Sequence, residues 1–321
     1  MSDQPPPPAG GAQPANAAKD ARAIARHLDR LARADAAPWL HQEVAQRMAG
    51  RLPVIRQAPA AWLDWWGFLG GGAAAVAGVW PQAQRLVAEP TPALLAKSRA
   101  ALSAPWLSQV WSQAWARARG HGAPTQVLSL PEVGDGAVQM VWANMMLHAV
   151  PEPSATLARW HRALGSEGYL MFSTLGPDTL RGLREVFADI GAPAPHPPFI
   201  DMHDLGDMLV HAGFADPVMD QEMLTLTWST PQAALAELRA LGGHYDPQRF
   251  AGLRTPRWHA RLLAALAARR GRDGRIALGF EIVYGHAFKA LPRADKAGLA
   301  TIPLQTLRDS LRRQRKPAGA G

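Results

Sequence analysis

Residues 61–89 read AWLDWWGFLGGGAAAVAGVWPQAQRLVAE, and this stretch decides the fold class. An apolar run, Ala61 to Asp64, is typical of a buried strand, and glycines follow it at positions 67, 70, 71 and 72. An alanine-rich segment, 73–80, then predicts a helix, and a second apolar strand, Arg85 to Ala88, ends at Glu89. A strand, a glycine turn, a helix, a strand and an acid, in this order, form the opening unit of a nucleotide-binding α/β sheet.

The rest of the chain continues the alternation of strands and helices. Further strands are expected at 126–128, 137–143, 169–173, 224–228 and 276–284. Helices are expected at 92–102, 153–164, 179–190, 205–212, 231–241 and 256–269. Residues 20–51 add two helices rather than one, because Pro38 interrupts the helical spacing. The pattern predicts a Rossmann-like α/β fold with a mostly parallel central sheet, helices on both faces and an elaborated C-terminal half.

Three parts of the chain differ in composition. Residues 1–19 are rich in proline, glycine and alanine and are predicted to form a disordered leader. Residues 20–290 are expected to form one domain with an N-terminal helical lead-in and substrate-side additions. Residues 291–321 are basic and are predicted to form a flexible tail.

Composition excludes several classes of function. The chain has no cysteine, which rules out disulfides, thiolate metal sites and cysteine nucleophiles. Its histidines lack metal-ligand spacing, so no metal is expected. The net charge of +8 comes without a nucleic-acid-binding motif, so nucleic acid ranks last among partners. The basic runs are either solvated helix faces or a docking surface for an acidic partner. No apolar run is long enough to span a bilayer, so we expect no membrane association and a cytoplasmic, soluble protein.

Four strings carry a resemblance to a known family. They read STLGPDTL at 173–180, FIDMHDLGD at 199–207, GFADPVMD at 213–220 and FEIVYGHAFK at 280–289. In this order they resemble the malonyl-[acyl-carrier protein] O-methyltransferases, and the resemblance extends from about residue 20 to residue 289. It implies a class I methyltransferase fold that uses S-adenosylmethionine. It also implies methylation of the free carboxylate of a malonyl thioester, on acyl carrier protein or coenzyme A, in the pimeloyl branch of biotin synthesis.

The resemblance also suggests which residues form the site. Those expected to hold the cofactor are Asp64, Gly67, Gly70, Gly71, Glu89, Gln126 and Asn144, with Glu89 on the ribose and Gln126 on the adenine. Catalytic positions are expected at His148, Tyr284 and His286, although a purely structural histidine is an equal alternative for His148. Substrate contacts are expected from Ser173, Thr174, Asp201 and His203, and from Arg181 and Lys289 on charge alone.

One motif departs from the family. The first strand of the family ends in Leu-Asp-x-Gly-x-Gly-x-Gly, whereas here Trp66 and Phe68 replace the first two glycines. Bulky side chains oppose close approach of backbone to a cofactor, although a register that uses Gly70, Gly71 and Gly72 would restore a glycine turn. Two hypotheses therefore stay open: a carboxyl methyltransferase, or a catalytically impaired relative with a binding or regulatory role.

Overall fold

A seven-stranded sheet runs through the residues that the computed structural model describes, which are 20–55, 57–103, 125–247, 249–250 and 252–290. The predicted leader and tail, 1–19 and 291–321, lie outside the described residues. The strands are β1 (Ala61–Trp65), β2 (Gln84–Glu89), β3 (Gln126–Ser129), β4 (Val138–Ala143), β5 (Leu164–Leu175), β6 (Phe214–Trp228) and β7 (Ile276–Lys289).

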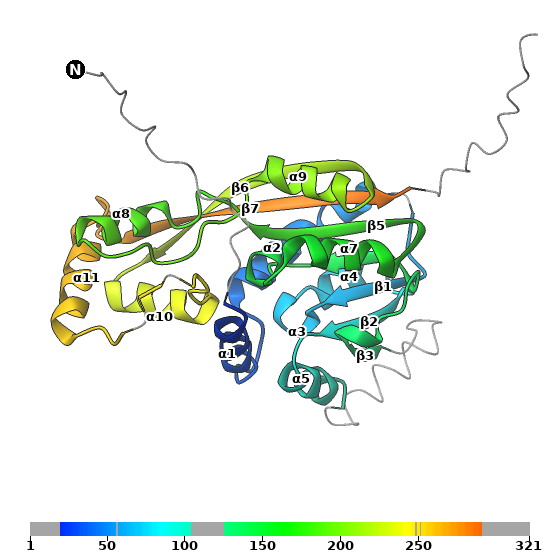
Figure 1. Ribbon diagram of the computed structural model, residues 1–321, viewed down its shortest axis with the longest axis horizontal. Helices are drawn as coiled ribbons and strands as arrows, with labels where there is room; N and C mark the ends of the chain where they lie inside the picture. Colours follow the sequence, from blue (N-terminus) through cyan, green and yellow to red (C-terminus); the bar gives the residue numbers. More distant parts are fainter. Residues whose placement is uncertain (1–19, 56, 104–124, 248, 251, 291–321) are drawn as a thin grey trace, which may run out of the picture. The chain divides into compact units, whose positions relative to one another are not determined.

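The strand order is β3-β2-β1-β4-β5-β7-β6. Neighbours from β3 to β5 pair in parallel, and β7 pairs antiparallel with both β5 and β6. Parallel pairs require crossovers, and helices supply them on both faces (Figure 1). The predicted Rossmann-like, mostly parallel sheet is confirmed.

Helices follow the predicted segments closely. They are α1 (Ala21–Leu31), α2 (Trp39–Ala49), α3 (Gly67–Gly70), α4 (Ala73–Val79), α5 (Pro92–Ser103), α7 (Pro153–Ala163), α8 (Arg181–Asp189), α9 (Met202–His211), α10 (Pro231–Leu241) and α11 (Pro256–Ala268). Short 3-10 turns are η1 (Leu52–Val54), η2 (Leu130–Glu132) and η3 (Leu147–Ala149). Helices α10 and α11 begin alike: Thr230 and Thr255 each accept a backbone N–H, and proline occupies the first turn.

Alternate residues of each strand divide the core into two layers. On one side of β1 and β4, Leu63 and Val141 pack with apolar residues of α1, α5, α7 and α9. On the other side, Trp62 and Met140 pack with residues of α2, α4, α8, α10 and α11. The near-continuous burial of the central strands reflects this double cover.

The antiparallel end of the sheet reaches further than the sequence predicted. Strand β6 runs from Phe214, ten positions before the expected start at Leu224, because its side chains alternate between half-buried and exposed and give no apolar run. Pro217 lies at a register shift in this edge strand, where the missing N–H is tolerated. The last β5 pair joins Leu175 to Ile282, and β6 and β7 continue past it to Trp228 and Ile276.

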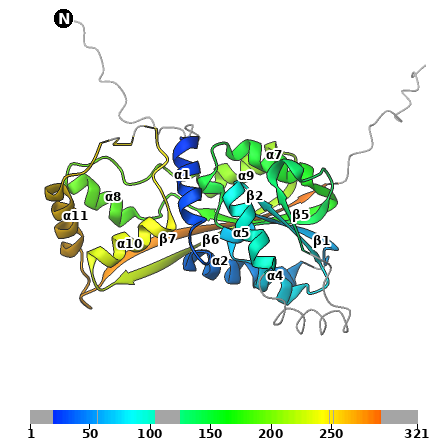
Figure 2. The same cartoon turned by 90° about the horizontal axis from the view of Figure 1, so that it is seen from below.

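This extension positions the site. Helices α8, α10 and α11 cover it, and Figure 2 shows α1 standing between that group and α5 and α7. Residues of these helices line a hollow beyond the carboxyl ends of β4 and β5.

Candidate functional site

The turn after β1 is built around a strained tryptophan. Trp66 adopts a left-handed conformation with φ of 58°, and its N–H donates to the Ala88 carbonyl over 2.7 Å. The glycine cluster then forms a single helical turn, α3, rather than an open loop, and Gly71 ends it at φ of +66°. An L side chain at Gly71 would be strained, so this glycine is used for a turn between two short helices.

Glu89 ends β2, as predicted, and its carboxylate is enclosed. Oε1 accepts the Phe68 backbone N–H over 2.8 Å and the Ser98 hydroxyl over 2.6 Å. Oε2 is buried without a hydrogen-bond partner among the described residues. Burial raises the pKa of Glu89 to about 7. The acid is therefore held inside the protein by the backbone of the turn after β1.

Asp64 lies on β1 just before this turn, and its carboxylate pairs with Arg85 on the neighbouring strand β2. Its Oδ2 accepts from Arg85 over 2.5 and 2.9 Å, and its side chain is fully buried. The ideal Cβ position on Gly67 lies 2.8 Å from the same oxygen, so glycine is required at that position. Burial raises the pKa of Asp64, while Arg85 opposes that rise.

Asn144 joins three segments in the interior. Its Nδ2 donates to the carbonyls of His41 and Gly70, each over 2.7 Å. Its Oδ1 accepts the Ser173 hydroxyl over 2.7 Å, and the Ser173 oxygen accepts the Met145 N–H. All of these groups are buried, so Asn144 and Ser173 connect the turn after β1 to the ends of β4 and β5. The structure places neither side chain on an open surface.

A crevice lies where the turn after β1 faces α1. We call it the cofactor crevice; it is bounded by His27, Leu28, Leu31, His41, Trp66, Leu69, Met145, His148, Ala149, Leu241 and Tyr245. Its free volume is only about 20 Å³. Trp66 is 5% exposed and packs in the same cluster as Leu28 and Leu31 of α1. Side chains of the protein therefore fill this space.

Helix α1 closes the crevice and is fastened at both ends. The Asp20 carboxylate pairs with Arg249 over 2.7 Å, and the Asp20 N–H donates to the Tyr245 carbonyl over 2.8 Å. At the other end, Arg30 donates to the carbonyls of Arg239 and Gly242.

A much larger hollow opens beside the crevice, beyond the ends of β4 and β5. We call it the acyl chamber; its volume is about 390 Å³. Its apolar wall comes from α8, α10, α11 and the strand ends, through Leu175, Leu180, Leu183, Phe187, Leu235, Leu238, Trp258, Leu262 and Phe280. Its polar wall includes His41, His148, His196 and Tyr245. His41, His148 and Tyr245 also border the cofactor crevice, so the two spaces adjoin.

The histidines of the acyl chamber are held in place by neighbouring groups. His196 stacks on Phe199 with ring centroids 4.8 Å apart, and His148 meets the same ring edge-on at 5.9 Å. The Thr174 hydroxyl lies 3.5 Å from Nδ1 of His148, so these two predicted residues are brought together. Burial lowers the pKa of both His41 and His196 to about 4, which keeps these rings neutral at pH 7.

Tyr284 and His286 lie elsewhere, which corrects the expectation that they join His148. They line a second hollow with Arg51 and Met171, and none of its lining residues belongs to the acyl chamber. The Tyr284 hydroxyl donates to Glu222 over 2.5 Å, and the Arg51 guanidinium covers its ring at 3.8 Å. Tyr284 pairs with Ser173 and His286 with Met171, two and four positions before the last residue of β5, and neither side chain lines the acyl chamber.

Two more expectations are corrected by strand position. Gln126 begins β3 opposite Leu86, whereas Glu89 pairs with Ser129 at the far end of that strand. Gln126 is therefore exposed and lies away from Glu89. Lys289 ends β7, and its Nζ donates to the carbonyls of His161 and Leu164 at the end of α7. It caps a helix at the amino ends of the parallel strands.

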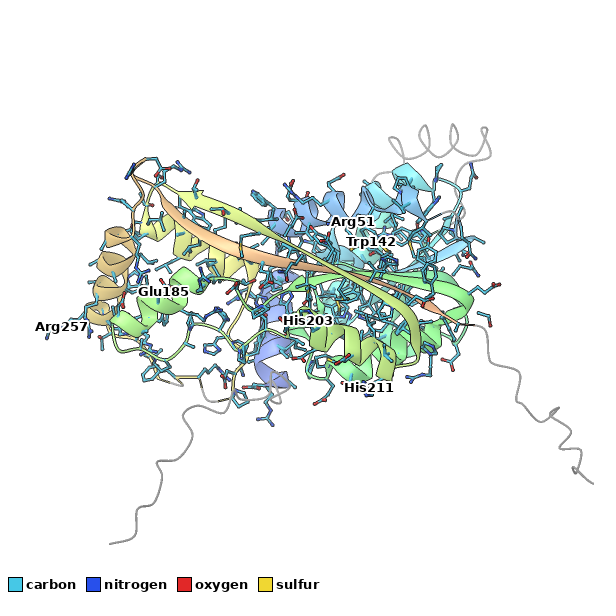
Figure 3. All side chains as sticks on the ribbon, turned by 90° about the horizontal axis from the view of Figure 1, so that it is seen from above. Arg51, Trp142, Glu185, His203, His211 and Arg257 are labelled. Carbon is cyan, nitrogen blue, oxygen red and sulfur yellow. The ribbon has the colours of Figure 1, made fainter. Side chains whose placement is uncertain are left out.

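The remaining predicted substrate residues lie on the surface. Asp201 caps α9 and accepts from His203, whose side chain is 81% exposed. Figure 3 shows His203 close to His211 on α9, with Arg51 on the other side of the β6–β7 ribbon. Arg181 pairs with Asp178 over 3.6 Å and is exposed. The structure brings none of Arg181, Asp201 and His203 to the acyl chamber.

The sequence interpretation missed three buried polar residues of the chamber, His41, His196 and Tyr245. His41 lies in α2, and His196 lies in a proline-rich loop. Neither is part of a motif with characteristic spacing. Only the fold brings these separated segments to the ends of β4 and β5.

Two general findings bear on the site. Within the described ranges, no three metal-ligating side chains gather as a metal site. In the same part of the chain, no helix is long and apolar enough to cross a membrane.

Comparisons with known proteins identify sequence relatives of this chain. A family model described as a methyltransferase domain matches residues 82–216. A malonyl-[acyl-carrier protein] O-methyltransferase of Gallionella capsiferriformans is 38% identical over 285 residues, which cover 88% of this chain and 96% of the relative. Its namesake in Laribacter hongkongensis is 40% identical over 264 residues, covering 81% and 86%. The solved YcgJ protein of Bacillus subtilis aligns with a TM-score of 0.47 at 11% identity, covering 77% of this chain and 99% of that one.

Proposed function

Because the chain belongs to the malonyl-[acyl-carrier protein] O-methyltransferase family, we propose that it methylates the free carboxylate of a malonyl thioester with S-adenosylmethionine as donor. We place this reaction in the pimeloyl branch of biotin synthesis, with acyl carrier protein presenting the malonyl group. We also place it in the cytoplasm, because a chain without cysteine suits a reducing compartment.

The observation that carries the proposal is the position of the acyl chamber. In open α/β sheets, ligands bind in the crevice outside the carboxyl ends of the strands. The acyl chamber lies there, with Leu175 from the end of β5 and His148 from the turn after β4 both lining it. Its volume of about 390 Å³ falls within the range of about 300–1,000 Å³ typical of small-molecule sites.

The chain's own residues contribute placement and the exclusion of water. A carboxylate is already a nucleophile, so the reaction needs no strong general base. The aliphatic wall from α8, α10 and α11 keeps water from the acyl group, which strengthens every electrostatic interaction within the chamber. Phe199 fixes the rings of His148 and His196 on the loop side of the same chamber. Proximity of this kind contributes several kcal/mol to a group transfer, about 7 or more in well-oriented cases.

The cofactor crevice itself is too small for the donor, and none of the residues predicted to hold the donor lines it. Trp66, Leu69 and α1 leave about 20 Å³ there, against at least about 300 Å³ for an ordinary ligand site. Gly67 and Gly71 instead line a separate hollow of about 310 Å³, together with Phe68 and Ser98. The chemistry of Glu89 suits a ribose, since one buried carboxylate oxygen has no partner among the described residues. Its other oxygen is held by Phe68 and Ser98. We therefore expect donor binding in the cofactor crevice to require displacement of α1 or Trp66.

This mismatch favours a second candidate function. A relative whose cofactor crevice is filled but whose acyl chamber is open would bind a carrier-bound acyl group without turning it over. The filled crevice supports this alternative, and the extent of the family match supports the enzyme.

Calorimetric titration with S-adenosylmethionine, followed by a methylation assay on malonyl-acyl carrier protein, separates the two. The enzyme requires donor binding and formation of the methyl ester. Absence of binding at millimolar donor, with no ester formed at high protein concentration, would leave the binding role. A biotin-requiring deletion strain gives an independent test, because only the enzyme restores growth without biotin.

A further inference from the structure

The buried histidines of the acyl chamber present lone pairs rather than protons. Nδ1 of His41 lies 2.9 Å from the Leu69 carbonyl oxygen, and Nδ1 of His196 lies 2.8 Å from that of Pro197. A carbonyl oxygen only accepts, so each Nδ1 carries the proton of its neutral ring. Nε2 is then an unprotonated acceptor, and Nε2 of His196 is buried with no partner within the described residues. An acceptor of this kind repels a carboxylate.

The donor in the same wall is a neutral hydroxyl. Tyr245 is buried, and its oxygen accepts the Gly243 N–H over 3.2 Å. Burial raises the pKa of Tyr245, so the phenol keeps its proton. Its O–H suits a carbonyl oxygen of an ester or a thioester.

The cations stay outside the interior of the chamber. Among the described residues that line it, the permanently charged side chains are Arg30 and Arg239, and both are exposed. The Arg30 guanidinium is also engaged by His27 and by two backbone carbonyls. The half-buried Arg184 of α8 acts on the His196 ring, but its guanidinium donates to the Thr179 carbonyl and the residue does not line the chamber. A carboxylate beside His41 and His196 would therefore lose its water without a permanently charged lining group beside it.

The direction from which the acyl chain enters places its terminal group, the carboxylate or the ester, deep in the acyl chamber. A carrier protein is far larger than the chamber and stays outside it, so the end of the acyl chain farthest from the carrier enters first. In a malonyl thioester that end is the carboxylate, and in the methylated product it is the uncharged ester.

We propose that the acyl chamber selects by charge, holding the ester-capped acyl thioester in preference to the same thioester with a free carboxylate. The proposal rests on the proposed function only for the identity of the acyl group. It assigns the chamber to the neutral product, while the charged substrate is held less tightly.

The test uses small thioesters without any methyl donor. The full chain is titrated calorimetrically with malonyl-N-acetylcysteamine thioester and with its monomethyl ester. We expect the ester to bind at least about tenfold more tightly, because burying an unpaired carboxylate is costly. Equal affinity, tighter binding of the acid, or no binding of either compound would overturn the proposal.

Two variants, each of which introduces one positive charge, test the reason for the preference. Leu238→Arg places a guanidinium on a half-buried position that lines the chamber, and Ala240→Arg places one on an exposed position of the same helix. The first variant should remove or reverse the preference for the ester, whereas the second should keep it. The same result in both variants would contradict the assigned location.

Failure of this inference and failure of the proposed function are distinguishable. Ester selectivity without turnover refutes methyl transfer alone. Turnover without ester selectivity refutes the charge-selective chamber alone.

Discussion

Replacing Trp66 by glycine tests whether the cofactor crevice is filled by a packed side chain. Trp66 is 5% exposed and contacts the cluster formed by α1 and the strands. Truncation of a buried tryptophan destabilises a protein by about 3–5 kcal/mol. Glycine relieves a left-handed conformation that costs a larger residue about 1–2 kcal/mol. Because glycine is more flexible in the unfolded chain, about 1 kcal/mol of this stabilisation is lost again. We therefore expect Trp66→Gly to lower the free energy of unfolding by about 2–5 kcal/mol.

Urea-induced unfolding measures this change, with Trp39→Ala as the control. Trp39 is 51% exposed at the start of α2, so its removal should change the free energy of unfolding by less than about 0.5 kcal/mol. The same Trp66→Gly protein should bind S-adenosylmethionine at least about tenfold more tightly than the parent, since the crevice gains the volume of an indole. A Trp66→Gly variant as stable as the parent, with unchanged donor affinity, would refute the account of the crevice.

Three further changes test other parts of the structure. Burial raises the pKa of Glu89 to about 7 from 4.5, so the stability that its protonated form provides is complete below pH 4.5 and is lost as pH rises through 7. Glu89→Gln should therefore gain about 2–3 kcal/mol relative to the parent between about pH 5 and pH 8, measured by urea unfolding; a difference between the two proteins that does not change with pH would contradict the raised pKa. Asn144→Ala removes three buried hydrogen bonds and should lower the free energy of unfolding by about 2–4 kcal/mol. Ser173→Ala should lower it by less, and equal losses for the two variants in thermal or urea unfolding would contradict a central role for Asn144. Lys289→Met removes two hydrogen bonds to carbonyls at the end of α7 and should lower the free energy of unfolding by about 1–3 kcal/mol, while the affinity for the thioester stays unchanged. A loss of thioester binding in calorimetry would show instead that Lys289 belongs to the substrate site.

The fold follows from local patterns in the sequence. Apolar runs gave β1, β2 and β4 within a residue or two, and α10 and α11 begin at the expected positions, Pro231 and Pro256. Strand β6 was found only in part because an exposed edge strand lacks an apolar run. The glycine cluster was expected to form a turn and instead forms α3, since the side chains of Trp66 and Leu69 have a core to join.

The site was predictable only where one strand end defines it. Glu89 lies at the end of β2, and His148 lies beside Thr174, as neighbouring strand ends require. Tyr284 and His286 were assigned to the same site because the sequence shows their alternation but not the register of β7 against β5. Lys289 and Arg181 were chosen on charge alone, and charge does not show which carbonyl or carboxylate a side chain reaches.

The loops hold the residues that the sequence could not assign. His196 and Tyr245 come from segments about fifty residues apart, yet both line the acyl chamber with His41 from α2. Their partners are backbone carbonyls and amides, and such bonds have no residue-type signature. Three-dimensional packing is needed to find them.

The most direct measurement of the central claim is the mass of malonyl-acyl carrier protein after incubation with excess protein and millimolar S-adenosylmethionine. The account predicts a mass increase of one methylene, formed slowly in the parent and faster in Trp66→Gly. No increase in either protein, under conditions in which the Gallionella capsiferriformans relative gives full conversion, would contradict methyl transfer by this chain.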